Sequence, residues 1–222
     1  MPLALLFDLD GTLVETIDAI VASMNAALAE FRESPLTQDE LRPLVGMPVR
    51  RQLDILRGMS DPVVDKIADR YYVHFMGFVD RGLPLYPGVV ETFPHLAGRA
   101  IGTMTTRRRD GAKRMLEVAG LLPYFRTVVG GDEVSRPKPF PDLPLHSAAA
   151  LGVRPEACAI IGDSPVDILA GRAARMWTIA VTYGYGDPGA LREAKPHEFL
   201  SRFEDLPRVL EDLDARAADP SG

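Results

Sequence analysis

The sequence predicts an α/β protein built on a doubly wound parallel sheet, with a small all-helical unit inserted after the first strand. Three observations predict it: an apolar run at residues 3–7, helical periodicity over 16–86, and alternating apolar and amphipathic segments from residue 88 onward. Alternation of this kind is typical of βαβ units, whose right-handed crossovers place parallel strands side by side with helices on both faces.

The first predicted strand, residues 3–7, is apolar throughout, as expected for a central strand that is buried on both faces. Asp8 and Asp10 follow it at once, with Gly11 behind them as a flexible turn. An unpaired buried carboxylate is strongly penalised, and open α/β sheets bind ligands at the C-terminal ends of their strands. The pair is therefore a candidate site, although Asp-rich turns also end strands without any functional role.

Residues 16–86 carry the pattern of helices. Apolar residues recur every three or four positions over 17–31 and again over 63–78, which places them on one face of a helix. Between these runs, Thr37 and Glu40 have the spacing of a capping box, and residues 49–56 continue the helical pattern. We therefore expect an all-helical domain between the first strand and the rest of the chain.

From residue 88 onward, strands and helices alternate. A helix is expected after Gly88, and Pro94 interrupts it. The predicted strands are 100–105, 127–130, 157–161 and 177–181, and the predicted helices are 109–119, 143–151 and 166–174.

Composition and charge narrow the classes of function. The 222 residues, 46% of them hydrophobic and 25% charged, are sufficient for one substantial core and a small accessory domain. With 25 basic against 31 acidic residues, the net charge is −6, and no nucleic-acid partner is expected. No apolar stretch approaches the roughly 18 residues that span a bilayer, so we expect no membrane association and a cytoplasmic location.

Cysteine and histidine usage argues against two further kinds of site. The single Cys158 has apolar neighbours, so it is expected inside a buried strand and is a poor candidate for a nucleophile. The four histidines lack the spacing of a zinc site.

Three later segments also place polar side chains after apolar stretches or in a stiff loop. Thr105 and Thr106 follow the apolar run that ends at 104, and Asp163 and Asp167 follow the run at 158–161. Lys138 lies between two prolines, whose rings restrict the loop that presents it.

Each of these signals also has an ordinary structural interpretation. Thr105 is a common strand residue, and Lys138 resembles many solvated loop lysines. Ser164 and Pro165 have the pattern of a helix start, in which Asp167 is the acid at the third helical position. Asp163 has no such role, because it precedes the cap.

The order Asp, Thr, Lys, Asp along the chain resembles the four motifs of the haloacid dehalogenase superfamily of phosphohydrolases, over about residues 3–213. This resemblance implies a Rossmann-like core formed by residues 1–15 and 87–222, with a helical cap domain at 16–86. It also implies a Mg²⁺-dependent enzyme whose partner is a small-molecule phosphate ester.

The resemblance assigns roles to the motif residues. Asp8 is implied as the nucleophile that forms an aspartyl phosphate, and Asp10 as the acid and base. Thr105 and Lys138 are implied to contact the phosphoryl oxygens.

The resemblance further implies that Mg²⁺ is held by Asp8, Asp163 and the backbone carbonyl of Asp10, with Asp167 as an outer partner. Charge supports this, because four carboxylates near a phosphate repel it unless cations offset them.

Residues 45–51 are the expected substrate-facing turn of the cap. Arg50 or Arg51 is a candidate partner for a substrate carboxylate or hydroxyl, although both also fit ordinary exposed helix positions. Thr106 is a further candidate substrate contact.

Within the superfamily, the chain is most similar to the phosphoglycolate phosphatases, on residues 130–134, the Lys138 loop and residues 182–186. It departs from them at Thr106 and Arg107, where Asn and Lys are usual, and at Arg175, where Gly is usual. A phosphomutase or pyrophosphatase of the same superfamily stays possible, as does a non-catalytic metal-binding regulatory protein. The sequence gives no indication of oligomeric state.

Overall fold

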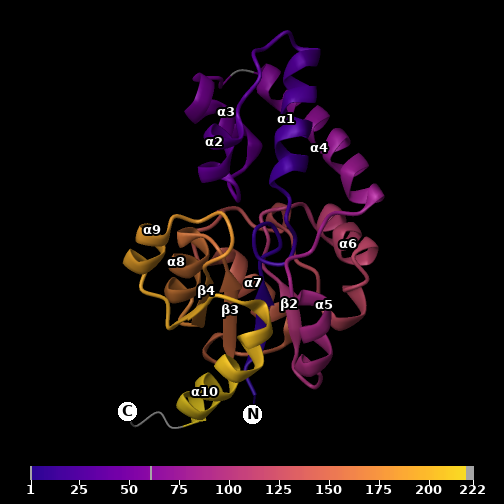
Figure 1. Cartoon of the computed structure of the whole chain (residues 1–222). Coiled ribbons are helices and arrows are strands. Elements are labelled where there is room, and N and C mark those ends of the chain that lie inside the picture. Colours follow the sequence, from indigo (N-terminus) through magenta and orange to yellow (C-terminus); the bar gives the residue numbers. More distant parts are fainter. Residues whose placement is uncertain (1, 61, 219–222) are drawn as a thin grey trace.

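Five short strands form one parallel sheet in the order β2-β1-β3-β4-β5, in a computed structural model that describes residues 2–60 and 62–218 (Figure 1). The predicted α/β class is therefore confirmed. The strands are β1 Ala4–Phe7, β2 Ile101–Thr103, β3 Cys158–Gly162, β4 Trp177–Val181 and β5 Glu198–Leu200.

The helices of the described chain fall into two groups. Four helices follow β1 directly: α1 Ile17–Glu30, α2 Gln38–Leu41, α3 Val49–Arg57 and α4 Pro62–Arg81. The others alternate with the remaining strands or follow the last one: α5 Val89–Thr92, α6 Arg109–Val118, α7 Asp142–Leu151, α8 Pro165–Ala173, α9 Pro188–Glu193 and α10 Leu206–Ala218.

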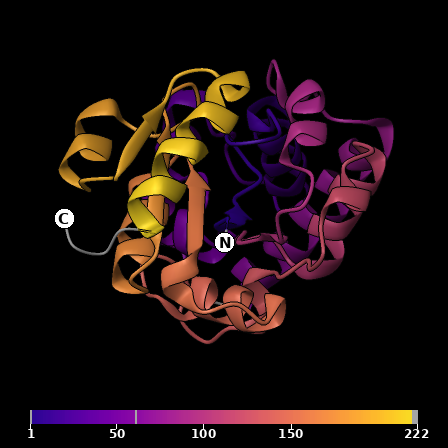
Figure 2. The same cartoon turned by 90° about the horizontal axis from the view of Figure 1, so that it is seen from below.

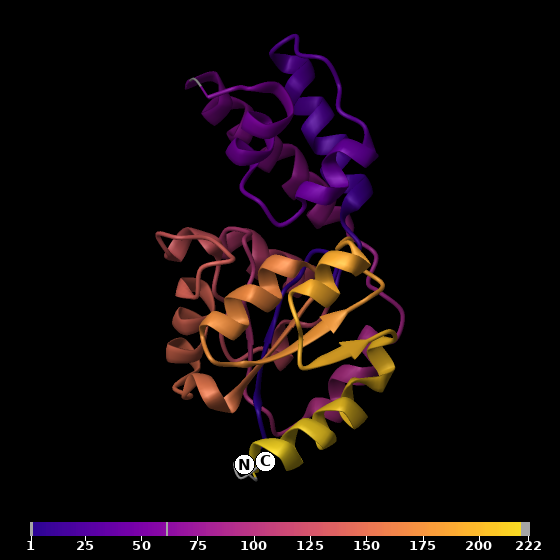
Figure 3. The ribbon, with the colours of Figure 1, turned by 90° about the vertical axis from the view of Figure 1, so that its left-hand side faces the viewer.

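Helices cover both faces of the sheet, as a doubly wound sheet requires. Successive side chains of a strand point to opposite faces. Leu5 and Phe7 accordingly join the larger buried cluster, which includes residues of α5 and α10, whereas Ala4 and Leu6 join a second cluster with residues of α7. Figure 2 shows β1 between these layers, and Figure 3 shows α7 and α8 on one side and α5 and α10 on the other.

Helices α1 to α4 stand above the C-terminal edge of the sheet, and the end of α4 reaches down to α6 of the core, where Asp80 pairs with Arg114 (Figures 1 and 3). The chain enters and leaves this helical unit through two adjacent segments. Val14 pairs with Leu85 in an antiparallel bridge, and the Glu15 amide donates to the Pro84 carbonyl at 2.8 Å. The proposed domain boundaries at 16 and 86 lie next to these two adjacent segments, and they stay a prediction.

Local signals placed several helix ends correctly. The Glu40 amide donates to the Thr37 hydroxyl at 3.3 Å, and the Thr37 amide donates to the Glu40 carboxylate at 2.7 Å. This is the predicted capping box at the start of α2. Pro94 has the predicted effect, because α5 ends at Thr92 and a short 3₁₀ turn, Phe93–Leu96, follows.

One strand prediction was wrong, and one strand was not predicted. Residues 127–130 form no strand and make only a single bridge, between Thr127 and Gly102. The Thr103 hydroxyl bonds both to the Val129 carbonyl and to its amide, at 2.8 and 2.7 Å, and so replaces ladder bonds there. Strand β5 was missed because it is a three-residue edge strand in which only Leu200 is buried, too short for a recognisable alternation.

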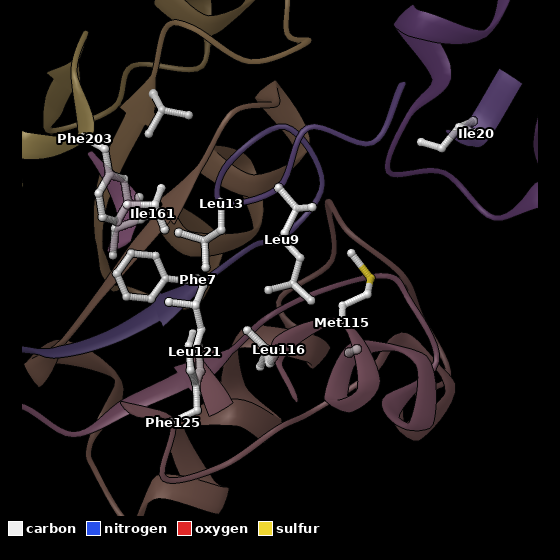
Figure 4. Close-up of a cluster of buried hydrophobic side chains, with 14 of the residues drawn as sticks. Phe7, Leu9, Leu13, Ile20, Met115, Leu116, Leu121, Phe125, Ile161 and Phe203 are labelled. Carbon is white, nitrogen blue, oxygen red and sulfur yellow. The ribbon is translucent and has the colours of Figure 1, made fainter. Parts of the chain in front are cut away.

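A cluster of aromatic rings fills the core beneath the C-terminal edge of β1. Phe7 lies 5.5 to 6.2 Å, centroid to centroid, from Phe93, Phe125 and Phe203. Figure 4 shows Phe7, Phe125 and Phe203 within this buried cluster. These rings fix the position of the strand from which Asp8 projects.

We expect Phe93→Ala to lower the free energy of unfolding by about 3–5 kcal/mol, because it leaves a cavity among close-packed rings. Chemical denaturation at equilibrium measures the change. Phe199→Ala is the matched control, since the Phe199 side chain is 46% exposed on the edge strand, and its cost should stay below about 1 kcal/mol. Equal losses in the two variants would contradict this assignment of the core.

No helix in the described part of the chain combines the length and the apolar character that a membrane span requires.

Candidate active site

The motif residues singled out in the sequence meet at the C-terminal edge of the sheet. Asp8 follows β1, Thr105 lies just beyond β2, and Asp163 follows β3. Parallel strands end at the same edge, so residues about 160 positions apart in the chain become neighbours. The Asp8 amide donates to the Ile161 carbonyl at 2.9 Å, which links the ends of β1 and β3 directly.

The turn after β1 requires glycine at position 11. Gly11 has a φ of 78°, a left-handed conformation that other residues adopt only with strain. A Cβ atom there would also lie 2.3 Å from Oδ2 of Asp163. Gly11 therefore lets the turn carrying Asp10 approach the carboxylate that follows β3.

Lys138 is buried within the carboxylate cluster. Its Nζ lies 2.5 Å from Oδ1 of Asp167 and 3.3 Å from Oδ1 of Asp8, and it donates to the Met104 carbonyl at 3.2 Å. Burial alone would lower its pKa, but the carboxylates of Asp167 and Asp8 raise it well above the ordinary value. Lys138 is therefore a fixed cation beside Asp8 and not a solvated loop lysine.

Asp163 is held by residues from two loops. Oδ1 accepts a hydrogen bond from the Thr12 hydroxyl at 3.2 Å, and Oδ2 accepts one from the Tyr185 amide at 2.8 Å. Burial, reinforced by the nearby Asp167 carboxylate, raises the pKa of Asp163 to about 7. A carboxyl group with this pKa binds protons readily unless a cation lies beside it.

Asp167 has both of the roles considered from the sequence. Its Oδ2 accepts hydrogen bonds from the Ser164 amide at 3.0 Å and the Ser164 hydroxyl at 2.7 Å, at the start of α8. Its Oδ1 pairs with Lys138. The helix-start interpretation was therefore correct, and it does not remove Asp167 from the site.

The described residues include one group of three carboxylates arranged to hold a cation. Asp8, Asp163 and Asp167 each offer an oxygen, and the three oxygens lie within 4.8 Å of one another. Oδ1 of Asp8 is buried and accepts no hydrogen bond, and burial raises the pKa of Asp8 well above its ordinary value. Three carboxylate oxygens this close together are hard donors of the kind that Mg²⁺ prefers, so the residues present fit this ion.

Asp10 has a different environment from Asp8. Its Oδ1 accepts hydrogen bonds from the Thr16 hydroxyl at 2.6 Å and from Nη2 of Arg107 at 2.7 Å, and its Oδ2 accepts one from Nε of Arg107 at 2.8 Å. Burial would raise the pKa of Asp10, but the charge and hydrogen bonds of Arg107, with help from Thr16, lower it. The surroundings of Asp8 therefore favour the protonated carboxyl group, whereas those of Asp10 favour the ionised carboxylate.

Arg107 is a site residue that sequence analysis missed. It appeared only as a departure from the usual Asn-Lys pair, with no role assigned. The structure places its guanidinium on both oxygens of Asp10, and its Nη1 donates to the Tyr71 hydroxyl at 3.0 Å. Since Tyr71 belongs to α4 and Asp10 to the sheet edge, Arg107 connects the helical unit to the core. Its position directly after Thr105 and Thr106 was the available signal.

Thr105 and Thr106 occupy the segment between β2 and α6. Thr105 is fully buried, and its hydroxyl oxygen accepts a hydrogen bond from the Arg107 amide at 3.2 Å. This leaves the hydroxyl hydrogen available to another acceptor. Thr106 lines a cavity between the helical unit and the core.

Two cavities adjoin the carboxylates. The larger, about 580 Å³, is lined by Asp8, Asp10 and Asp163, together with residues 183–187. The smaller, about 240 Å³, has Asp10 and Arg107 on the core side and residues 45–49 on the cap side. We call this smaller space the cap–core cavity.

The structure does not bring Arg50 and Arg51 to either cavity. Arg50 pairs with Asp65 and Arg51 pairs with Asp54, and their side chains are 49% and 64% exposed. The expected turn does line the cap–core cavity through residues 45–49, but the helix that begins at Val49 carries both arginines away from it. The geometry therefore gives them the ordinary role of exposed helix residues, and Gln52 is the next residue of this helix that lines the cavity.

Comparisons with known proteins agree with this arrangement. A family model described as haloacid dehalogenase-like hydrolase matches residues 5–181. A phosphoglycolate phosphatase of Agrobacterium fabrum is 33% identical and covers 98% of this chain and 96% of its own length. A pyrophosphatase of Bacillus velezensis is 30% identical over 91% of this chain and 94% of its own length.

The fold has counterparts among solved structures. The crystal structure of β-phosphoglucomutase from Clostridium difficile superposes with a TM-score of 0.81 at 20% sequence identity, over 97% of this chain and all of that one. With the motif order, the site at the sheet edge and a family match over most of the sequence, the chain belongs to the haloacid dehalogenase-like hydrolases.

Proposed function

We propose that the protein is a Mg²⁺-dependent phosphatase that hydrolyses a small organic phosphate monoester through an aspartyl phosphate, with phosphoglycolate as the leading substrate. Membership of this hydrolase family makes the chain an enzyme. The observation that supports the mechanism is the pairing of Asp8, whose buried Oδ1 accepts no hydrogen bond, with the fixed cation Lys138 at 3.3 Å.

The reaction has two steps. In the first, a carboxylate oxygen of Asp8 attacks phosphorus, the bond from phosphorus to the ester oxygen breaks, and Asp10 gives that oxygen a proton. In the second, water attacks the phosphorus, Asp10 takes a proton from it, and the bond to Asp8 breaks. Asp10 is therefore protonated again at the end of the two steps, as it was before the first.

Lys138 and Thr105 stabilise charge during both steps. The Lys138 ammonium offsets negative charge on Asp8 and on the phosphoryl oxygens, and the Thr105 hydroxyl donates a hydrogen bond to those oxygens. Both side chains are buried, so they are held in place before the substrate arrives.

Asp8, Asp163 and the backbone carbonyl of Asp10 would hold Mg²⁺, with Asp167 as an outer partner. When bound, the ion supplies positive charge that reduces repulsion between the carboxylates and an anionic phosphate.

The protonation state of Asp10 can change between the two steps as each of them requires. Without substrate, Arg107 favours the ionised carboxylate, which is the form that acts as a base. An anionic phosphate nearby raises the pKa of a carboxyl group, which is the direction that proton donation requires.

The size of the cap–core cavity supports a compact leaving group. Its volume of about 240 Å³ is less than half of the 580 Å³ of the neighbouring cavity. Asp10 borders this cavity and would donate its proton there. A two-carbon acid such as glycolate fits the space, and a relative of nearly the same length is named for that substrate.

We expect the purified protein to hydrolyse p-nitrophenyl phosphate with Mg²⁺, to lose that activity in EDTA, and to regain it when Mg²⁺ is added in excess. The physical reason is that the carboxylate cluster repels phosphate without a cation. A phosphate-release assay measures it. Full activity in chelator would contradict the proposed metal role, and no turnover with Mg²⁺ would favour the non-catalytic regulatory protein.

A panel of substrates separates the remaining candidates. Phosphoglycolate should exceed pyrophosphate, glucose 1-phosphate, AMP and p-nitrophenyl phosphate by at least about tenfold in kcat/KM, equal to roughly 1.4 kcal/mol. A preference for pyrophosphate would indicate the activity named for the Bacillus velezensis relative. Transfer of the phosphoryl group from the enzyme to a sugar, in place of water, would indicate a phosphomutase.

A further inference from the structure

The geometry points to Arg107 as the residue that selects the substrate: its guanidinium holds Asp10 with one edge and binds a carboxylate on the leaving group with its remaining N–H groups. The inference rests on the proposed phosphatase function and names the substrate class, which is phosphate esters of small hydroxy acids. It places the carboxylate partner in the core, at a position where no role was assigned from the sequence.

The hydrogen bonds of Arg107 leave donors free. A guanidinium has five N–H groups. Within the described residues, Nε and Nη2 each donate to Asp10 and Nη1 donates once to Tyr71. Two N–H groups of Arg107 therefore have no acceptor, in a side chain that is only 13% exposed. Buried donors without partners are costly, so a ligand that accepts from them is favoured.

The position of these donors matches the expected place of the leaving group. Arg107 lines the cap–core cavity beside Asp10, which is the group that protonates the ester oxygen. In a phosphate ester of a two-carbon acid, the carboxylate lies one carbon from that oxygen. A substrate whose ester oxygen meets Asp10 therefore carries its carboxylate into the space that Arg107 borders.

Arg107 is held rigidly enough to discriminate. Its Cζ lies 3.6 Å from the centroid of the Phe75 ring, and the Tyr71 hydroxyl fixes one end of the guanidinium. Both residues belong to α4 of the cap. A planar guanidinium held in this way matches a planar carboxylate, whereas a neutral amide offers it only one acceptor.

The test compares phosphoglycolate with phosphoglycolamide, its neutral amide with the same number of heavy atoms. Wild-type protein should prefer phosphoglycolate by about 10- to 100-fold in kcat/KM, the range for a charge-assisted pair. Arg107→Gln should bring that ratio to within about threefold of one. The ratio isolates carboxylate binding, because the loss of support for Asp10 affects both substrates equally.

Two further variants keep the test decisive. Arg109→Gln removes the same charge two residues along the chain, at the first residue of α6, but Arg109 is largely exposed and lies outside the cap–core cavity, so its ratio should match wild type. Arg107→Lys retains a cation beside Asp10, so it provides a second test in case Arg107→Gln misfolds. The ratio of kcat/KM for the two substrates should lie between the ratios of wild type and Arg107→Gln. An unchanged ratio in both Arg107 variants, or no preference in wild type, overturns the inference.

The outcomes also separate this inference from the proposed function. If wild type hydrolyses both substrates equally and Asp8→Asn hydrolyses neither, the phosphatase mechanism stands and the role of Arg107 falls. If wild type hydrolyses neither of them nor p-nitrophenyl phosphate, the proposed function fails first.

Discussion

Asp8→Asn should abolish phosphatase activity. We expect kcat to decrease by at least about 10⁴-fold, which is the usual scale for removal of a catalytic nucleophile. An amide oxygen is a poor nucleophile, and the change also removes one of the three carboxylates that would hold the cation. The measurement is phosphate release with Mg²⁺ at saturating substrate.

The fold should survive this substitution. Burial disfavours the charge of Asp8, and Asp167 and Asp163 add repulsion, so a neutral amide of the same shape relieves an unfavourable interaction. Lys138 keeps Asp167 as its partner at 2.5 Å. We expect a Tm no lower than that of wild type. Asp212→Asn, at an exposed position of α10, is the matched control and should retain full activity. Activity of Asp8→Asn within a few fold of wild type would eliminate the mechanism.

Asp10→Asn should slow hydrolysis of alkyl phosphates such as phosphoglycolate by about 10²- to 10⁴-fold, because it removes both the acid and the base. The loss in the first step should be smaller for p-nitrophenyl phosphate, since nitrophenolate leaves without a proton. Pre-steady-state release of nitrophenol separates this first step from hydrolysis of the aspartyl phosphate.

Asp10→Asn should also be less stable than wild type, because it removes the charge that compensates the buried guanidinium of Arg107. Activity is therefore compared well below the Tm of the variant. A variant that hydrolyses phosphoglycolate as fast as wild type would remove Asp10 from the chemistry. If the rate of the first step decreases equally for both substrates, Asp10 positions the substrate and does not protonate the leaving group.

The opposite environments of Asp8 and Asp10 explain how neighbouring carboxylates take different roles. Oδ1 of Asp8 is buried and pairs with the Lys138 ammonium at 3.3 Å, whereas Asp10 accepts hydrogen bonds from a guanidinium and a hydroxyl. Such a difference in surroundings, and not a difference in residue type, distinguishes a nucleophile from an acid and base.

Several features of the protein were determined by the sequence alone. The parallel sheet follows from apolar runs that alternate with amphipathic segments, and the capping box at Thr37 and the break at Pro94 are local effects of a few residues. The gathering of Asp8, Thr105 and Asp163 was also predictable, because each follows a strand and the ends of parallel strands share one edge. Lys138 lies in a loop that no strand precedes directly, so its place beside Asp8 was implied only by the family resemblance.

Other features were decided only by the tertiary structure. Strand β5 and the irregular segment at 127–130 depend on which backbone groups find partners across the sheet, and short segments carry too little pattern to show this. The sequence presents Arg50, Arg51 and Arg107 as equivalent arginines near predicted turns. Only the packing of α4 against the sheet edge gives Arg107 a buried carboxylate and leaves the other two with exposed partners, because the interactions of a long, flexible side chain depend on what surrounds it in three dimensions.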